Sequence, residues 1–255
     1  MQLHQTQAAI TGGASGLGLA VARHLIAHGA SVTLLDVNEE KGQAVAKELG
    51  ERARFARLDV TSEADARTVL AEAKAAMGGL NAMISCAGIL GAGRVLGKDG
   101  PMPLSQFETT VRVNLVGSFN MAKAGADLMQ ANAPGDDGER GVIVNTASIA
   151  AFEGQIGQAA YSASKGGVVA MALPMAREFA RIGVRVMTVA PGVFHTPMVD
   201  GMPPAVYDSL CAQVPYPSRL GKPDEFADAV AFILQNRYLN GSVIRVDGAI
   251  RLQPK

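Results

Sequence analysis

Short apolar runs alternate with amphipathic segments along the whole chain. The runs are four to six residues long, which is typical of strands buried on both faces of a parallel sheet, and they cover residues 7–10, 31–35, 54–58, 81–85, 141–146, 184–189 and 242–246. Helical spacing of apolar residues follows over residues 20–26, 39–49, 63–77, 105–132, 161–180 and 223–235. The alternation predicts an α/β fold, a doubly wound parallel sheet of about seven strands with helices on both faces.

Three segments interrupt this pattern. Residues 91–104 are rich in glycine and predict an extended loop, and residues 133–140 predict a polar turn. Residues 193–220 hold five prolines among scattered apolar side chains, a composition that suits a mobile lid over a substrate. None of the three indicates a domain boundary, so we expect residues 1–255 to form a single domain with a substrate lid around 193–220.

Composition argues against several classes of protein. The chain has 23 basic and 23 acidic residues, so it has no global charge that would attract nucleic acid. It contains no apolar stretch of about 18 residues, and no membrane span is expected. Residues 1–7 lack the pattern of a signal peptide, which favours a cytoplasmic location. Cys86 and Cys211 have no metal-ligand spacing, and no bound metal is expected.

A glycine-rich turn connects the first predicted strand to the first predicted helix. Gly12, Gly16 and Gly18 follow the spacing G-x-x-x-G-x-G, which departs from the G-x-G-x-x-G dinucleotide fingerprint. Glycine allows a tight turn and the close approach of a ligand, and the helix offers unpaired backbone N–H groups to a pyrophosphate. The turn therefore predicts a nucleotide site, with an ordinary tight turn as the alternative.

An acidic residue follows the second predicted strand. Asp36 lies 18 residues after Gly18, near the position where a carboxylate accepts hydrogen bonds from the adenosine ribose. Neither Val37 nor Asn38 is basic, and a carboxylate repels a 2′-phosphate, so NAD is favoured over NADP. A solvated aspartate at a strand end is the alternative.

Further candidate residues stand at the ends of other strands, where ligands bind in sheets of this kind. Asp59 and Val60 are placed to flank an adenine ring, and the small residues 86–88 would let a cofactor lie close to the backbone. Ser148 follows the fifth strand, and Pro191 follows the sixth. Because parallel strands end at one edge of the sheet, we expect these residues to converge on one site.

Tyr161 and Lys165 are four residues apart in a predicted helix, so their side chains share one face. A tyrosine pKa of about 10 must fall by roughly 2 to 3 units for the phenol to act as a base near neutral pH. A lysine charge about 4 Å away would contribute roughly 4 kcal/mol toward this shift at an effective dielectric of about 20. The pair is therefore predicted to be a proton shuttle, although an isolated pair with this spacing is more often a surface feature.

Several motifs, taken in order, resemble those of the short-chain dehydrogenase/reductase family over the whole chain. They are Thr11-Gly12-x-x-x-Gly16-x-Gly18, Asn114, Ser148, Tyr161-x-x-x-Lys165 and Pro191-Gly192. Asn114 alone is ambiguous, because a mid-helix asparagine is often merely tolerated or bends the helix. The resemblance implies a Rossmann-type sheet, NAD as cofactor, oxidation of a CH–OH group and a homotetramer.

The resemblance also implies a role for each site residue. Tyr161 takes the hydroxyl proton, Ser148 orients the hydroxyl, and Lys165 tunes the tyrosine and holds the nicotinamide ribose. Asn114, the fourth catalytic residue, supports a water chain that returns the proton to solvent. Cofactor contacts are implied for Gly12, Ser15, Gly16, Leu17, Gly18, Asp36, Asp59, Val60, Cys86, Gly88, Tyr161, Lys165, Pro191, Phe194 and Thr196. Substrate contacts are implied for Ser148, Gln155 and Tyr161.

Other segments resemble a narrower group of the family, whose members oxidise 3-hydroxyacyl-CoA thioesters in fatty acid metabolism. These segments are residues 150–161, 194–197, 215–220 and 240–250. Cys86 stands where the broad family usually has asparagine, although the narrower group resembles this chain there. His195 stands where a glycine is expected, and its bulk bears on lid mobility and substrate fit.

Other functions remain open, because the lid sets substrate choice and cannot be read from residue spacing. An alcohol or hydroxysteroid dehydrogenase would use the same catalytic residues. An NADPH-linked 3-oxoacyl carrier reductase would too, although Asp36 argues against it. A non-catalytic alternative is a scaffold, because the family includes a member that serves in a transfer-RNA processing assembly. The complete catalytic set favours an enzyme whose partner is a small molecule, an acyl-CoA.

Overall fold

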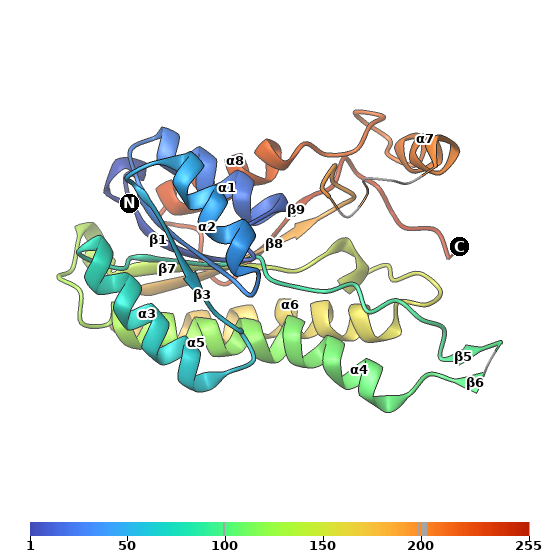
Figure 1. Ribbon diagram of the computed structural model, residues 1–255, viewed down its shortest axis with the longest axis horizontal. Coiled ribbons are helices and arrows are strands. Elements are labelled where there is room, and N and C mark those ends of the chain that lie inside the picture. The colour runs from blue at the N-terminus through green and yellow to red at the C-terminus, as the bar shows by residue number, and fades with distance from the viewer. Residues whose placement is uncertain (99, 198, 200–202, 255) are drawn as a thin grey trace.

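The computed structural model describes residues 1–98, 100–197, 199 and 203–254. Within this part of the chain, seven parallel strands form one sheet in the order β3-β2-β1-β4-β7-β8-β9 (Figure 1). The strands are β1 (Gln7–Thr11), β2 (Ser31–Asp36), β3 (Ala53–Arg57), β4 (Ala82–Ser85), β7 (Gly141–Thr146), β8 (Val184–Pro191) and β9 (Val243–Val246). The strand order reverses between β1 and β4, where sheets of this kind bind ligands. The predicted fold class is confirmed.

Helices cover both faces of the sheet (Figure 1). One layer contains α1 (Gly16–Ala27), α2 (Glu39–Leu49) and α8 (Pro223–Gln235). The opposite layer contains α3 (Glu63–Met77), α4 (Leu104–Val111), α5 (Gly117–Met129) and α6 (Ala159–Phe179). Short 3-10 turns lie at Leu3–Gln5, Asp136–Gly138, Ile149–Ala151 and Ala180–Ile182. No helix in the described part of the chain is both long and apolar enough to span a membrane.

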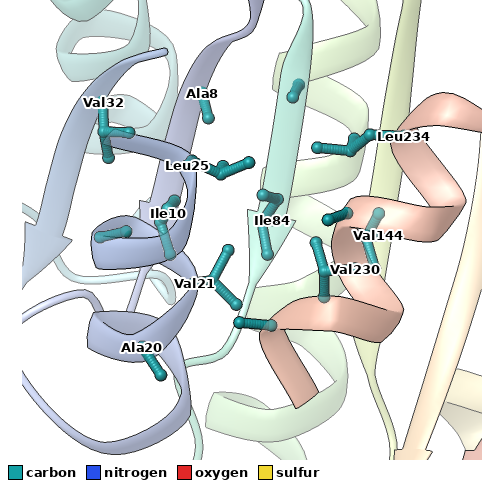
Figure 2. Close-up of a cluster of buried hydrophobic side chains, with 14 of the residues drawn as sticks. Ala8, Ile10, Ala20, Val21, Leu25, Val32, Ile84, Val144, Val230 and Leu234 are labelled. Carbon is teal, nitrogen blue, oxygen red and sulfur yellow. The ribbon is translucent and has the colours of Figure 1, made fainter. Parts of the chain in front are cut away.

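The sheet is buried on both faces, which explains why its strands are continuous apolar runs. Figure 2 shows the core beneath the first layer, where strand residues meet α1 and α8 and the labelled side chains include Ile10, Val21, Leu25, Ile84, Val144, Val230 and Leu234. Alternate residues of the same strands, such as Met83 and Ile143, face the second core beneath α3, α5 and α6.

Two segments differ from the sequence prediction, and in a third the structure adds a helix. The run 105–132 is not one α-helix, because a π-helical turn (Arg112–Val116) separates α4 from α5. The expected loop 91–104 contains a two-stranded antiparallel hairpin, β5 (Leu96–Gly97) and β6 (Gly100–Pro101). The predicted lid contains α7 (Pro204–Ala212), which a proline can begin because the first turn leaves its N–H groups unpaired. Residues 198 and 200–202 of that lid lie outside the described residues.

Candidate active site

A cleft of about 680 Å³ lies at the carboxyl ends of the parallel strands. Its lining includes every residue predicted to contact cofactor or substrate, from the glycine turn, the ends of the strands, α6 and the start of the lid. Asn114 is the one predicted site residue that does not line it. The sheet topology therefore brings together residues that are up to 184 positions apart, from Gly12 to Thr196.

The glycine turn between β1 and α1 needs its glycines for two reasons. Gly12 and Gly16 have φ angles of 63° and 52°, in the left-handed region that favours glycine. At Gly18 a Cβ atom would lie 2.4 Å from the carbonyl oxygen of Gly12, so the close packing of the helix against the turn excludes a side chain. The turn consequently presents backbone to the cleft, the arrangement that admits a pyrophosphate.

Asp36 lies at the end of β2 and faces this turn. One carboxylate oxygen accepts from the backbone N–H of Asn38 (3.0 Å), and the other accepts from that of Ala14 (3.3 Å). These two bonds fix the carboxylate at the rim of the cleft while leaving it partly exposed. A carboxylate oxygen has acceptor capacity beyond one bond, so Asp36 can also accept from hydroxyl groups of a ligand.

Asn114 lies in the π-helical turn and is fully buried. Its amide accepts from Ile89 N (2.8 Å) and donates to Ile89 O (2.9 Å) and to Ser164 Oγ (3.0 Å). Ser118 Oγ donates to its backbone carbonyl (2.7 Å). A Cβ atom at Gly88 would lie 3.1 Å from Asn114 Oδ1, so the glycine lets the loop after β4 approach this amide. Asn114 thus joins that loop to α6.

Ser148, Tyr161 and Lys165 form the centre of the cleft. Ser148 follows β7, accepts from Ala150 N through its hydroxyl (3.1 Å) and lies beside Tyr161, whose pKa it lowers. Lys165 Nζ donates to the carbonyl of Thr146 (2.8 Å) and lies 5.8 Å from the centre of the Tyr161 ring. The helical spacing of Tyr161 and Lys165 therefore places both side chains in the same cleft, with Lys165 buried and Tyr161 half-buried.

The pKa of Tyr161 shifts in the opposite direction to our prediction. Burial raises this pKa above its ordinary value of 10, and the hydrogen bond with Ser148 only partly offsets the effect. Burial also lowers the pKa of Lys165 to about 8, and the electrostatic interaction with Cys86 only partly opposes this shift. Loss of hydration is therefore the dominant influence on the pKa of Tyr161 in the protein alone. The expectation that Lys165 by itself lowers the pKa of Tyr161 is therefore wrong.

Cys86 stands at the start of the loop after β4. Burial raises the pKa of its thiol to about 11, and Thr146 Oγ1 donates to the sulfur (3.5 Å). The side chain is therefore a neutral thiol at physiological pH, small enough to border a ligand. Among the described residues, no group of three or more His, Cys, Asp or Glu side chains is arranged to hold a metal ion.

The lid begins with a buried anchor and continues over the cleft. Phe194 is buried and meets Phe226 of α8 edge to face, with ring centres 6.2 Å apart. Thr196 lies beside Gly16, where a Cβ atom on the glycine would be 3.8 Å from the threonine side chain. The ring of His195 meets Tyr207 of α7 edge to face at 5.9 Å. The residue found in place of the expected glycine therefore joins two parts of the lid.

The C-terminal segment is a part of the site that sequence reasoning missed. Leu252 lines the cleft, and the carbonyl of Gln253 accepts from Gln155 Nε2 (3.1 Å). Arg245 makes two hydrogen bonds to Glu153 (2.8 and 2.9 Å) next to this contact. Gln155 thus points partly toward the C-terminal segment. These contacts join residues about a hundred positions apart, for which the sequence holds no local signal.

The fold and the site define the class of protein. A model of the short chain dehydrogenase family matches residues 6–205. The chain belongs to this family, and it is an oxidoreductase that acts on the CH–OH group of a small molecule with a nicotinamide cofactor.

The most similar relatives include proteins with one shared name. The 3-hydroxyacyl-CoA dehydrogenase type-2 of Homo sapiens is 54% identical over 97% of this chain and 95% of its own length. That of Drosophila melanogaster is 50% identical over 96% of this chain and 97% of its own. The crystal structure of 3-hydroxyacyl-CoA dehydrogenase type-2 from Mycobacterium avium has a TM-score of 0.92 and 43% identity, covering 97% and 96% of the two chains.

Proposed function

We propose that this chain oxidises the 3-hydroxyl group of 3-hydroxyacyl-CoA thioesters and uses NAD as the hydride acceptor. The observation that carries the proposal is the meeting of Ser148, Tyr161 and Lys165 in one cleft, where Lys165 Nζ lies 5.8 Å from the centre of the Tyr161 ring. Relatives that share about half of its residues over nearly its full length are named for this substrate. The reaction belongs to fatty acid metabolism.

The residues at the cleft fit a dinucleotide. The glycines of the turn line the cleft without side chains, and Asp36 stands at its rim. The bound oxidised nicotinamide would supply the hydride acceptor. Asp36 favours NAD, because a carboxylate accepts from ribose hydroxyls and repels a 2′-phosphate.

The side chains divide the proton chemistry between them. Tyr161 removes the proton of the substrate hydroxyl, and Ser148 donates to the same oxygen and steadies the developing carbonyl. Lys165 is held beside them by the Thr146 carbonyl. Since burial raises the pKa of Tyr161, turnover in the oxidative direction is expected to increase with pH until the phenol is ionised. Support of a water chain by Asn114 and assembly into a homotetramer stay predictions.

A substrate panel tests the proposal. Purified protein is mixed with NAD and, in parallel, with 3-hydroxyacyl-CoA thioesters, hydroxysteroids and simple secondary alcohols, and formation of reduced cofactor is followed. Fast turnover of a thioester supports the proposal. Turnover of another panel alone would keep the Tyr161 chemistry and reassign the substrate, and inactivity on all three would favour a scaffold role.

Cofactor choice is tested separately with Asp36→Asn. Loss of the carboxylate is expected to raise KM for NAD about tenfold, equal to roughly 1.4 kcal/mol, and to narrow the preference over NADP. Glu39→Gln is the matched control, because Glu39 is an exposed acid nearby that does not line the cleft. If the ratio of kcat/KM with NAD to kcat/KM with NADP were the same in Asp36→Asn as in the unmodified chain, the assignment of Asp36 to the adenosine ribose would be wrong.

A further inference from the structure

A row of buried polar side chains crosses the centre of the sheet. Ser85 of β4, Asn145 of β7 and Thr188 of β8 are paired in register, and none is more than 3% exposed. Paired residues point to the same face, here the face beneath α5 and α6. The row lies between an apolar cluster that includes Met83 and another that includes Ala147.

Four atoms of this row have no hydrogen-bond partner in the described part of the chain. They are Ser85 Oγ, Asn145 Nδ2, Asn145 Oδ1 and Thr188 Oγ1. Two buried hydroxyls of the covering helices are already engaged, because Ser118 Oγ donates to Asn114 O and Ser164 Oγ donates to Tyr161 O. Buried polar groups are nearly always paired with protein or ordered water, so a set of unpaired atoms in one row requires a partner.

The spacing of the row indicates what that partner is. None of these side-chain atoms hydrogen-bonds its cross-strand neighbour, and a spacing of about 4.8 Å between neighbouring strands lets one small molecule bond both side chains of a pair. The amide of Asn145 presents a donor and an acceptor, whereas a cation accepts no hydrogen bond and an anion donates none. Water does both.

We propose that the row binds internal water. One molecule bridges Asn145 to Ser85 on one neighbouring strand, and another bridges Asn145 to Thr188 on the other neighbouring strand. This site is separate from the cofactor cleft and does not rest on the proposed function. Cys86 follows Ser85, and Thr146, whose carbonyl holds Lys165, follows Asn145. The bridging water therefore connects neighbouring strands at the level where their ends enter the cleft.

Removal of one hydroxyl by an isosteric substitution tests the proposal, because a water-filled row and a dry row predict opposite changes in Tm. Thr188→Val removes one partner of the bridging water, so the Tm is expected to fall. Thr33→Val is the matched control, because Thr33 Oγ1 is equally buried and unpaired but its cross-strand neighbours are Ala9 and Arg54. The control is expected to keep or raise the Tm, since it removes a lone unpaired hydroxyl. An equal or higher Tm for Thr188→Val would indicate a dry row and overturn the proposal.

A second measurement detects the water directly. Oxygen-17 magnetic relaxation dispersion counts water molecules that stay in a protein far longer than surface water. We expect the count to fall in Thr188→Val relative to the unmodified chain and to stay unchanged in Thr33→Val. An identical count in all three proteins would overturn the proposal even if Thr188→Val were less stable, because the instability would then come from packing.

Discussion

The inner and outer halves of the cleft are held in place by different interactions. In the inner half, Asn114, Ser148 and Lys165 are buried and hydrogen-bonded to backbone groups of neighbouring segments. The outer half is the lid, whose helix α7 does not itself line the cleft; every residue of α7 is at least partly exposed, and the ring contact of His195 with Tyr207 joins it to the start of the lid.

This difference separates chemistry from substrate choice. Buried hydrogen bonds leave the inner side chains little freedom, because breaking one strands a polar group away from water. Exposed contacts contribute less to stability than buried hydrogen bonds, and they can open without unfolding the core. Changes in the inner half should therefore act on kcat, and changes in the outer half should act on the KM of the substrate.

The largest effect is expected from Tyr161→Phe, which keeps the ring and removes the proton acceptor. We expect kcat to fall by roughly 10² to 10⁴, the usual contribution of general acid–base catalysis. Initial rates measure this loss, while thermal unfolding and cofactor binding show that fold and cleft persist. If a folded variant kept most of its turnover, Tyr161 would not be the proton acceptor, and the assignment of the chemistry to the inner half would be wrong.

A smaller effect is expected from Lys165→Met on the pH dependence of stability. Burial lowers the pKa of Lys165 from 10.5 to about 8, so above pH 8 the unfolded chain binds a proton that the folded chain has lost. Stability of the unmodified chain should rise with pH, by at most about 1.4 kcal/mol per unit. Cys86 opposes this rise above pH 9, because its buried thiol has a pKa of about 11 and keeps its proton after the unfolded chain has lost it.

The clearest range for this test is therefore pH 8 to 9. Urea unfolding at half-unit steps measures the slope, and Lys165→Met should abolish it. Cys86→Ala serves as the companion variant, because without the thiol the rise should continue beyond pH 9. If Lys165→Met kept the slope of the unmodified chain, burial of the lysine would not be its source.

The smallest effect is expected from His195→Gly in the outer half. Loss of an aromatic pair worth about 0.5 to 1.5 kcal/mol should raise the KM of the substrate roughly 2- to 10-fold and leave kcat nearly unchanged. Tyr207→Leu removes the other ring of the same pair and should behave alike. A collapse of kcat in His195→Gly would show that the lid takes part in the chemistry.

The sequence by itself determined the features that depend on local period and spacing. Seven apolar runs predicted the strands, and the four-residue interval between Tyr161 and Lys165 placed both on one helical face. The glycine turn was recognisable because few other residues tolerate its backbone angles. Strand ends then predicted one shared edge, because parallel strands must end together.

Only the tertiary structure decided how these residues behave. The upward shift of the Tyr161 pKa follows from desolvation by every segment packed around the phenol, which no interval along the chain records. The acceptor of Lys165 is a backbone carbonyl on another strand, and the partner of Gln155 is the distant C-terminal segment. Local pattern fixes which side chains are available, whereas burial and long-range contact fix their charge and partners.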